Sequence, residues 1–177
     1  MQRYTSTAIA LHWLMAVMII ANFTLGVVMV DIPGLTPTKL RYFSWHKWAG
    51  VTILLLATVR LLWRLKHPAP PLPDTMPRWE KLAANGSHLL LYVLLFAVPL
   101  SGYFYTLAAG VPVVYFGVIE LPVLIGRDPA LKEVLETTHF GLNLLLAATV
   151  AVHVLAALKH QFIDRDSVLR RMLPVRT

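Results

Sequence analysis

Four long stretches with almost no charge constrain the fold of this sequence more than any other feature. They run over about residues 6–30, 43–63, 82–107 and 135–162. The hydrocarbon core of a bilayer is about 30 Å thick, and roughly 20 apolar residues cross it as a helix. In lipid only helices and closed barrels satisfy all backbone hydrogen bonds, and these stretches lack the alternation of barrel strands. The sequence therefore predicts an all-α integral membrane protein, a four-helix transmembrane bundle that forms a single domain over residues 1–177.

The composition excludes several classes of function. Of the 177 residues, 57% are hydrophobic and 14% are charged, whereas a soluble domain carries roughly 25% charged residues. We therefore exclude a soluble enzyme, a disordered tail and a nucleic-acid binder, although the net charge is +7. The sequence contains no cysteine, which excludes disulfides, thiolate-bound iron–sulfur clusters and covalently attached haem c.

The distribution of Lys and Arg predicts the orientation in the membrane. One side of the stretches carries Arg3, Arg64, Lys66, Arg78, Lys81, Lys159, Arg165, Arg170, Arg171 and Arg176. The other side carries only Lys39, Arg41, Lys47, Arg127 and Lys132. Because cytoplasmic segments carry the excess of Lys and Arg, we expect both termini in the cytoplasm.

One further apolar segment, over about residues 110–127, is interrupted by Gly110, Pro112, Gly117 and Pro122. Glycine and proline break regular helix, so we expect a loop at or shallowly within the membrane surface rather than a fifth span. We find no internal repeat in the sequence.

Histidines are the unusual feature of so apolar a chain. Six of the seven lie within the apolar stretches or at their ends: His12, His46, His88, His139, His153 and His160. Any one of them has a plain interpretation as a hydrogen-bonded residue of the bundle. Ionisable residues inside membrane spans are costly, however, and usually mark a functional site.

The spacing of the histidines places them at two depths. His139 and His153 share the fourth stretch and are 14 residues apart, which puts both on one helix face roughly 21 Å apart. His46 opens the second stretch at the level of His139, and His12 lies at about the level of His153. His88 enters the third stretch as deeply as His12 enters the first, so spacing alone leaves His88 as a rival partner for His153.

Two pairs of histidines at two depths match the requirement of two b-type haems, each held by two imidazoles from facing helices. Zinc is a poorer match because it needs three or four ligands converging on one point. Small residues along these helices would leave room for a flat macrocycle: Gly26, Gly50, Gly141 and Ala147. A haem-free transporter bundle, in which the histidines relay protons, remains open.

An ordered set of motifs carries a family resemblance. In order these are His12-Trp13, Ser44-Trp45-His46, Arg60-Leu-Leu-Trp-Arg-Leu-Lys66 before a proline-rich loop, Ser87-His88-Leu, Thr138-His139, and then His153 and His160. Along essentially its full length the chain resembles the bacterial cytochrome b561 family of small dihaem inner-membrane proteins. The resemblance implies that the axial iron ligands are His12 with His153 at the inner haem b, and His46 with His139 at the outer haem b.

The resemblance also implies a quinone site beside the cytoplasmic haem. We expect His88 and His160 there, able to bind quinone carbonyls or to relay protons. Arg78, Lys81 and Trp13 lie at the same end. Each of these residues also has a plainer interpretation. The two histidines would reach water at the membrane surface, Arg78 and Lys81 would be ordinary cytoplasmic charges, and Trp13 would be a packing aromatic. Arg60 either pairs with a haem propionate or extends to the cytoplasmic surface.

The better-understood member type of this family is a superoxide oxidase, which passes electrons from superoxide to ubiquinone. We therefore expect an oxidoreductase that oxidises superoxide, or another periplasmic donor, and reduces ubiquinone. Lys39, Arg41 and Lys47 lie near His46 and would attract a small anion. The alternative within the family is a non-catalytic relay subunit that receives electrons from a soluble dehydrogenase or hydrogenase.

Overall fold

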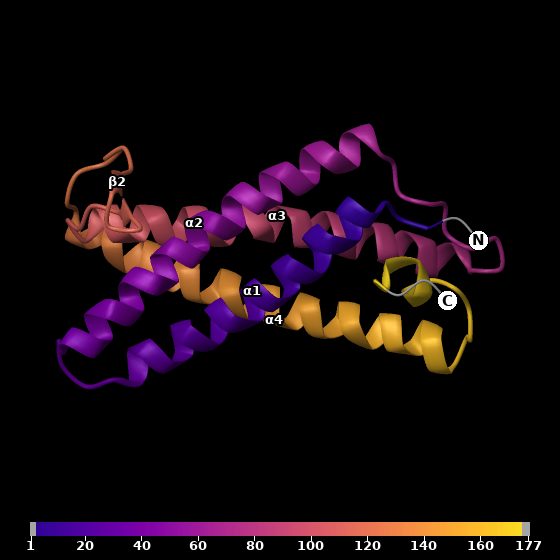
Figure 1. Cartoon of the computed structure of the whole chain (residues 1–177). Helices are drawn as coiled ribbons and strands as arrows, with labels where there is room; N and C mark the ends of the chain where they lie inside the picture. The colour runs from indigo at the N-terminus through magenta and orange to yellow at the C-terminus, as the bar shows by residue number, and fades with distance from the viewer. Residues whose placement is uncertain (1–2, 175–177) are drawn as a thin grey trace.

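The computed structural model describes residues 3–174 and contains four long helices (Figure 1). They are α1 (Ser6–Asp31), α2 (Pro37–Lys66), α3 (Arg78–Ala108) and α4 (Pro129–Phe162). All four are long and apolar enough to cross a membrane. The predicted four-helix transmembrane bundle is confirmed. Arg176, counted above among the charges of one side, lies outside the described residues.

Two of the helices begin six residues earlier than the apolar stretches do. The Thr36 side chain accepts a hydrogen bond from the Lys39 backbone N–H at 3.1 Å, and Pro37 is the first residue of α2. Asp128 caps α4 in the same way, accepting from the Leu131 N–H at 3.0 Å. Caps and an early proline are typical starts of a helix. Hydropathy thus marks the part of a helix that crosses lipid, whereas capping residues mark where the helix begins.

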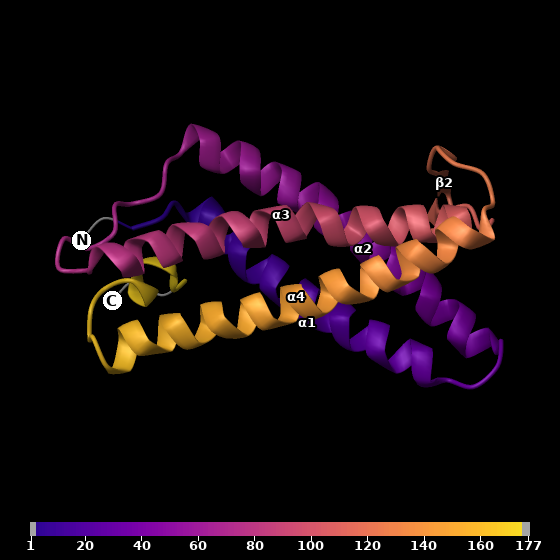
Figure 2. The same cartoon turned by 180° about the vertical axis from the view of Figure 1, so that it is seen from behind.

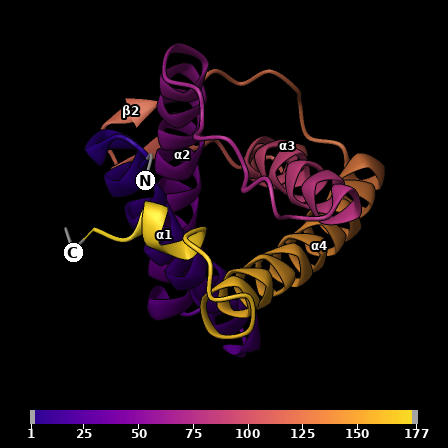
Figure 3. The ribbon, with the colours of Figure 1, turned by 90° about the vertical axis from the view of Figure 1, so that its right-hand side faces the viewer.

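The helices form two antiparallel hairpins, α1–α2 and α3–α4, that cross one another (Figure 2). Seen from its end, the bundle has the four helices arranged around a shared interior (Figure 3). One buried cluster comprises Met15, Ile53, Ala57 and Leu95, and a second comprises Leu94, Val98 and Leu146. Many other apolar side chains are exposed on the outside of the bundle, as expected for a surface that faces lipid.

The segment between α3 and α4 forms a short antiparallel hairpin of β1 (Val114–Tyr115) and β2 (Ile119–Glu120). Its turn contains Phe116 and Gly117, both with positive φ. The hairpin is fastened to α2, because the Trp48 indole N–H donates to the Val114 carbonyl at 2.7 Å. The expectation of a loop rather than a fifth span is confirmed.

The short helix η1 (Leu169–Met172) returns to the start of α1 (Figure 1). The Trp13 indole N–H donates to the Met172 carbonyl at 2.8 Å, and the Tyr4 N–H donates to the Arg171 carbonyl at 3.4 Å. The first helix and the last thus meet at one end of the bundle. We call this the inner end, and the opposite end, which carries the β hairpin, the outer end.

Candidate functional site

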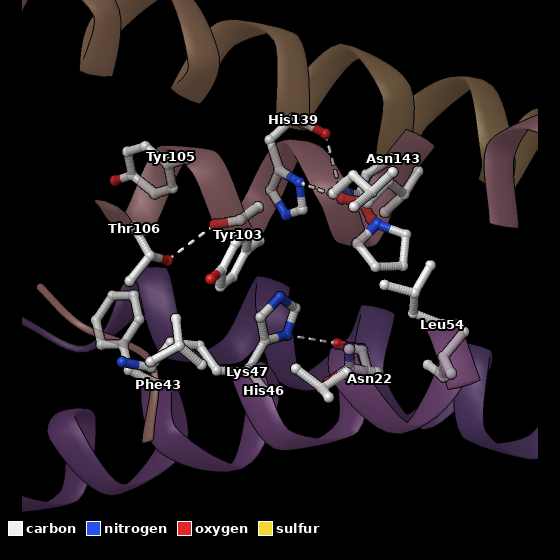
Figure 4. A pocket seen from close by; sticks show the side chains of 18 of the residues that line it. Asn22, Phe43, His46, Lys47, Leu54, Tyr103, Tyr105, Thr106, His139 and Asn143 are labelled. Atoms are coloured by element: carbon white, nitrogen blue, oxygen red, sulfur yellow. Dashed lines mark hydrogen bonds between the residues drawn. The ribbon is translucent and has the colours of Figure 1, made fainter. Parts of the chain in front are cut away.

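Two imidazoles face one another across a cavity near the outer end of the bundle. His46 of α2 and His139 of α4 have ring centroids 6.3 Å apart and ring planes at 88° (Figure 4). The cavity has a volume of about 730 Å³ and is lined by all four helices and by the segment between α3 and α4. A cavity of this size can enclose most of a cofactor-sized molecule.

The backbone of a neighbouring helix holds each imidazole in the same way. The Nδ1 atom of His46 lies 3.1 Å from the Asn22 carbonyl oxygen of α1. The Nδ1 atom of His139 lies 3.1 Å from the Val98 carbonyl oxygen of α3, and 3.0 Å from the Ser101 hydroxyl. Because a carbonyl oxygen only accepts, Nδ1 carries the proton in both rings. The unprotonated Nε2 of each ring is therefore available to bind a metal.

A glycine lies against each of the two rings. A Cβ atom at Gly26 would lie 3.1 Å from Cε1 of His46, and one at Gly102 would lie 2.8 Å from Cε1 of His139. Each glycine comes four residues after the carbonyl that binds the ring, at Asn22 and Val98. The absence of a side chain therefore lets each imidazole pack on the helix backbone.

This arrangement repeats between the two hairpins. Asn22 and Val98, like Gly26 and Gly102, are 76 residues apart, and the same interval separates His12 from His88. The recurrence is one of local geometry, and our expectation that the sequence has no internal repeat stays a prediction. Few residues match at this interval, so the pattern is too sparse to identify from sequence.

Three histidines meet at the inner level of the bundle. The ring centroids of His12 and His153 are 6.2 Å apart, with ring planes at 69°. His88 approaches the same His153 ring more closely, at 5.5 Å. The Trp13 ring packs edge-on against His12 at 5.4 Å. Arg60 is half-buried beside this group and donates to the Ala8 carbonyl at 3.3 Å.

The two wider separations fit a metal held between two imidazoles. An imidazole nitrogen binds a transition metal at about 2 Å, and the ring centroid lies about 1.1 Å beyond it, so opposed rings have centroids roughly 6.2 Å apart. The observed 6.3 Å and 6.2 Å match this spacing. The 5.5 Å between His88 and His153 is too short for it. The donor sets therefore fit two bis-imidazole haem irons.

His160 lies at the inner end, in a cluster of charged residues. It is buried, and its Nδ1 atom lies 2.7 Å from Asp166 Oδ2 and 3.1 Å from Asp164 Oδ2. Next to it, Lys159 pairs with Glu80 at 2.9 Å and with Asp164 at 2.7 Å, which joins the end of α4 to the start of α3.

The residues expected at a quinone site are dispersed around this end. Arg78 is exposed at the first residue of α3, and Lys81 is half-buried one turn later. The indole N–H of Trp13 is engaged by the Met172 carbonyl. Within residues 3–174, no hydrogen bond or ring contact joins His160 to His88.

The family model of prokaryotic cytochrome b561 matches residues 3–175. The chain belongs to the prokaryotic cytochrome b561 family. Members of this family are electron-transfer cytochromes that bind haem b, and the chain is accordingly a multi-pass membrane protein of a bacterial type.

Named relatives agree with this assignment. Cytochrome b561 homolog 2 of Escherichia coli (strain K12) is 36% identical over 173 residues, which cover 97% of this chain and 92% of that protein. A probable superoxide oxidase, CybB, of Yersinia pestis is 29% identical over 178 residues, which cover 98% and 97%. Cytochrome b561 homolog 1 of Escherichia coli (strain K12) is 26% identical over 176 residues, which cover 99% of each chain.

For this cytochrome b561 the structure adds site residues that our sequence analysis missed. Gly102 and Ser101 contact the His139 ring, and Asp166 contacts His160. Of the glycines expected to leave room for a macrocycle, Gly50 and Gly141 have nothing within 4 Å of the Cβ position, and Gly50 lines the outer cavity. The space at Gly26 is filled by the His46 ring. Gly102 matches Gly26 at the interval of 76 residues, a match that is too sparse to have identified it from sequence alone.

Proposed function

We propose that this cytochrome is a dihaem superoxide:ubiquinone oxidoreductase of the bacterial inner membrane, with both termini in the cytoplasm. His46 and His139 supply the axial imidazoles at the outer haem b, and His12 and His153 supply them at the inner haem b. The observation that carries this proposal is the spacing of the two ring pairs, 6.3 Å and 6.2 Å, at two levels of one bundle. Haem b, when bound, supplies reversible one-electron chemistry.

The protein's contribution at the outer level is to orient the ligands before the cofactor binds. The Asn22 and Val98 carbonyls hold the Nδ1 protons of His46 and His139, so each Nε2 keeps its lone pair. Gly26 and Gly102 let both rings lie against a helix backbone. These contacts restrict the side-chain conformations of His46 and His139 before a cofactor binds, so binding costs less conformational entropy.

Spacing also favours His12 over His88 as the partner of His153. The His12 ring stands at the distance that a shared metal requires, whereas the His88 ring is closer to His153 than such a metal allows. His88 then lies beside the inner site as an additional polar group. Arg60, half-buried among these three rings, is placed to pair with a propionate there.

Superoxide is the electron donor in this proposal. The relative named as a probable superoxide oxidase covers nearly the whole chain. Arg41 is exposed at the outer end, and Lys47 lines the outer cavity. Positive charge at the mouth of a low-dielectric cavity raises the rate at which a small anion arrives.

Ubiquinone is the acceptor, at the inner end beside His160. Reduction of a quinone consumes protons, and the Nδ1 atom of His160 lies 2.7 Å from Asp166 and 3.1 Å from Asp164, two carboxylates whose side chains are partly exposed. These contacts offer a route for protons from the surface to a buried imidazole. Arg78, Lys81 and His88 are further polar residues of the proposed quinone site, at the inner end but not in contact with His160, while Trp13 contributes packing because its N–H is already bound.

The test is a measurement of haem content and turnover on the purified protein in detergent. We expect two haems b per chain by pyridine haemochrome, and reduction of a soluble ubiquinone that depends on enzymatically generated superoxide. His46→Ala and His139→Ala should each lose one haem. His67→Ala is the matched control and should keep both haems, because His67 lies just after the end of α2 and stacks on Trp63. A protein with two haems but no superoxide-dependent quinone reduction would indicate the relay role instead.

A further inference from the structure

Lys47 is the one Lys, Arg, Asp or Glu among the described residues that line the outer cavity. The other lining side chains are mostly apolar, with hydroxyl groups, two amides and the two facing imidazoles as the polar exceptions. A single cation in such surroundings is unusual, because burying charge without a partner is costly.

The side chain of Lys47 is placed at the mouth of the cavity rather than at its centre. Lys47 follows His46 on α2 and is half-buried. Its side chain runs away from the two imidazoles toward Phe43, at the end of the cavity where Tyr105 and Thr106 lie (Figure 4). The ammonium group therefore stands to the outer side of the space between His46 and His139.

The neighbouring cations of the outer end are placed differently. The Lys39 ammonium donates to the Ile32 carbonyl at 2.6 Å, where it satisfies the end of α1. Arg41 is exposed and does not line the cavity. Within residues 3–174 the structure gives Lys47 no ion pair, since the five ion pairs lie on other residues. An anionic group from a ligand would supply the missing partner.

We propose that the Lys47 ammonium binds a propionate carboxylate of the macrocycle held between His46 and His139. This inference rests on the proposed haem ligation. Haem b carries two carboxylates on one edge, and an ammonium–carboxylate hydrogen bond is among the stronger polar contacts in proteins. Lys47 would thus fix the rotation of the macrocycle in the cavity, with its carboxylate edge toward the outer end.

The pairing has an electrostatic consequence that can be measured. A cation beside the macrocycle disfavours the oxidised iron, which carries one more positive charge than the reduced iron. Removing the ammonium also leaves the carboxylate uncompensated, and this change favours the oxidised state too. Loss of the Lys47 charge should therefore lower the midpoint potential of the outer haem alone.

The experiment is a spectroelectrochemical titration of the purified full-length protein and three variants. Lys47→Met removes the charge and keeps the length, Lys47→Arg keeps the charge, and Arg41→Met removes a charge that does not line the cavity. We expect Lys47→Met to shift one of two haem transitions to lower potential. The midpoint potentials of Lys47→Arg should stay close to those of the parent protein. Arg41→Met should lower the potential of the same transition by less than Lys47→Met does.

Each result bears on the inference. Unchanged potentials in Lys47→Met with two haems bound would overturn it, also where superoxide oxidation slows, since the ammonium would then act only on the arriving anion. If Lys47→Met loses one haem, retention of that haem in Lys47→Arg supports the pairing, and loss in both variants overturns it. A parent protein without haem would instead contradict the proposed function itself.

Discussion

His139 packs so closely on Gly102 that a Cβ atom at this position would lie 2.8 Å from the Cε1 atom of the ring. Real side-chain contacts do not reach this distance, so any substitution must displace the ring or separate α3 from α4. The same ring is held by the Val98 carbonyl one turn earlier on α3. Helix–helix approach and the placement of a proposed haem ligand therefore depend on one glycine.

We expect Gly102→Ala to weaken or remove the outer haem, because the methyl group pushes the imidazole from its position. Overpacking of this kind costs about 1–3 kcal/mol of stability. Haem content and thermal unfolding of the purified variant would measure both effects. Gly86→Ala is the control for the outer haem, since Gly86 lies at the other end of α3 and its Cβ position has nothing within 4 Å. Equal behaviour of the two variants would contradict the role assigned to Gly102.

At the inner level, we expect His12→Ala to lose one haem and His88→Ala to keep both. The reason is the separation from His153, which is 6.2 Å for His12 and 5.5 Å for His88. Pyridine haemochrome quantitation and the low-spin haem signals in electron paramagnetic resonance would report the outcome. The reverse pattern would make His88 the ligand.

We expect Asp166→Asn to slow quinone reduction while both haem spectra stay intact. Asp166 lies 2.7 Å from Nδ1 of His160. The amide oxygen of Asn could still accept a hydrogen bond from this ring, but it could not take up or release the proton as a carboxylate does. Loss of a positioned acid or base typically costs about 10²-fold or more in rate. Asp164→Asn should have a smaller effect because Asp164 lies 3.1 Å away. Stopped-flow reduction of ubiquinone after a superoxide pulse separates this step from oxidation of the donor, and an unaltered rate in Asp166→Asn would exclude the proton route.

Val113 and Leu121, which flank the β hairpin, line the outer cavity, and Trp48 fastens the hairpin to α2 through the Val114 carbonyl. We expect Trp48→Phe to lower stability by about 1 kcal/mol, the usual net value of one hydrogen bond. The loosened hairpin should also speed transfer of haem to an external acceptor protein. Trp45→Phe serves as the control, because Trp45 stacks on Tyr42 away from the hairpin. The same release rate in both variants would show that the hairpin does not retain the cofactor.

The number of helices and their approximate positions followed from the sequence because crossing a bilayer is a local requirement. Each helix must satisfy its own backbone hydrogen bonds in lipid, so the length and apolar character of a single segment suffice to identify it. The two levels of histidine followed for the same reason, since helix rise converts residue intervals into depth. The exact starts of α2 and α4 did not follow from hydropathy, because Thr36 and Asp128 cap them outside the apolar stretches.

Which side chains meet across the bundle depended on the tertiary structure. His12 and His88 enter their helices at equal depth, and only the packing of the two hairpins places their rings at different distances from His153. The contact of Gly102 with His139 and the position of Lys47 in the cavity have the same origin. Such contacts depend on how each helix is rotated and crossed against its neighbours, and these quantities are set by side-chain packing between distant segments rather than by any single segment.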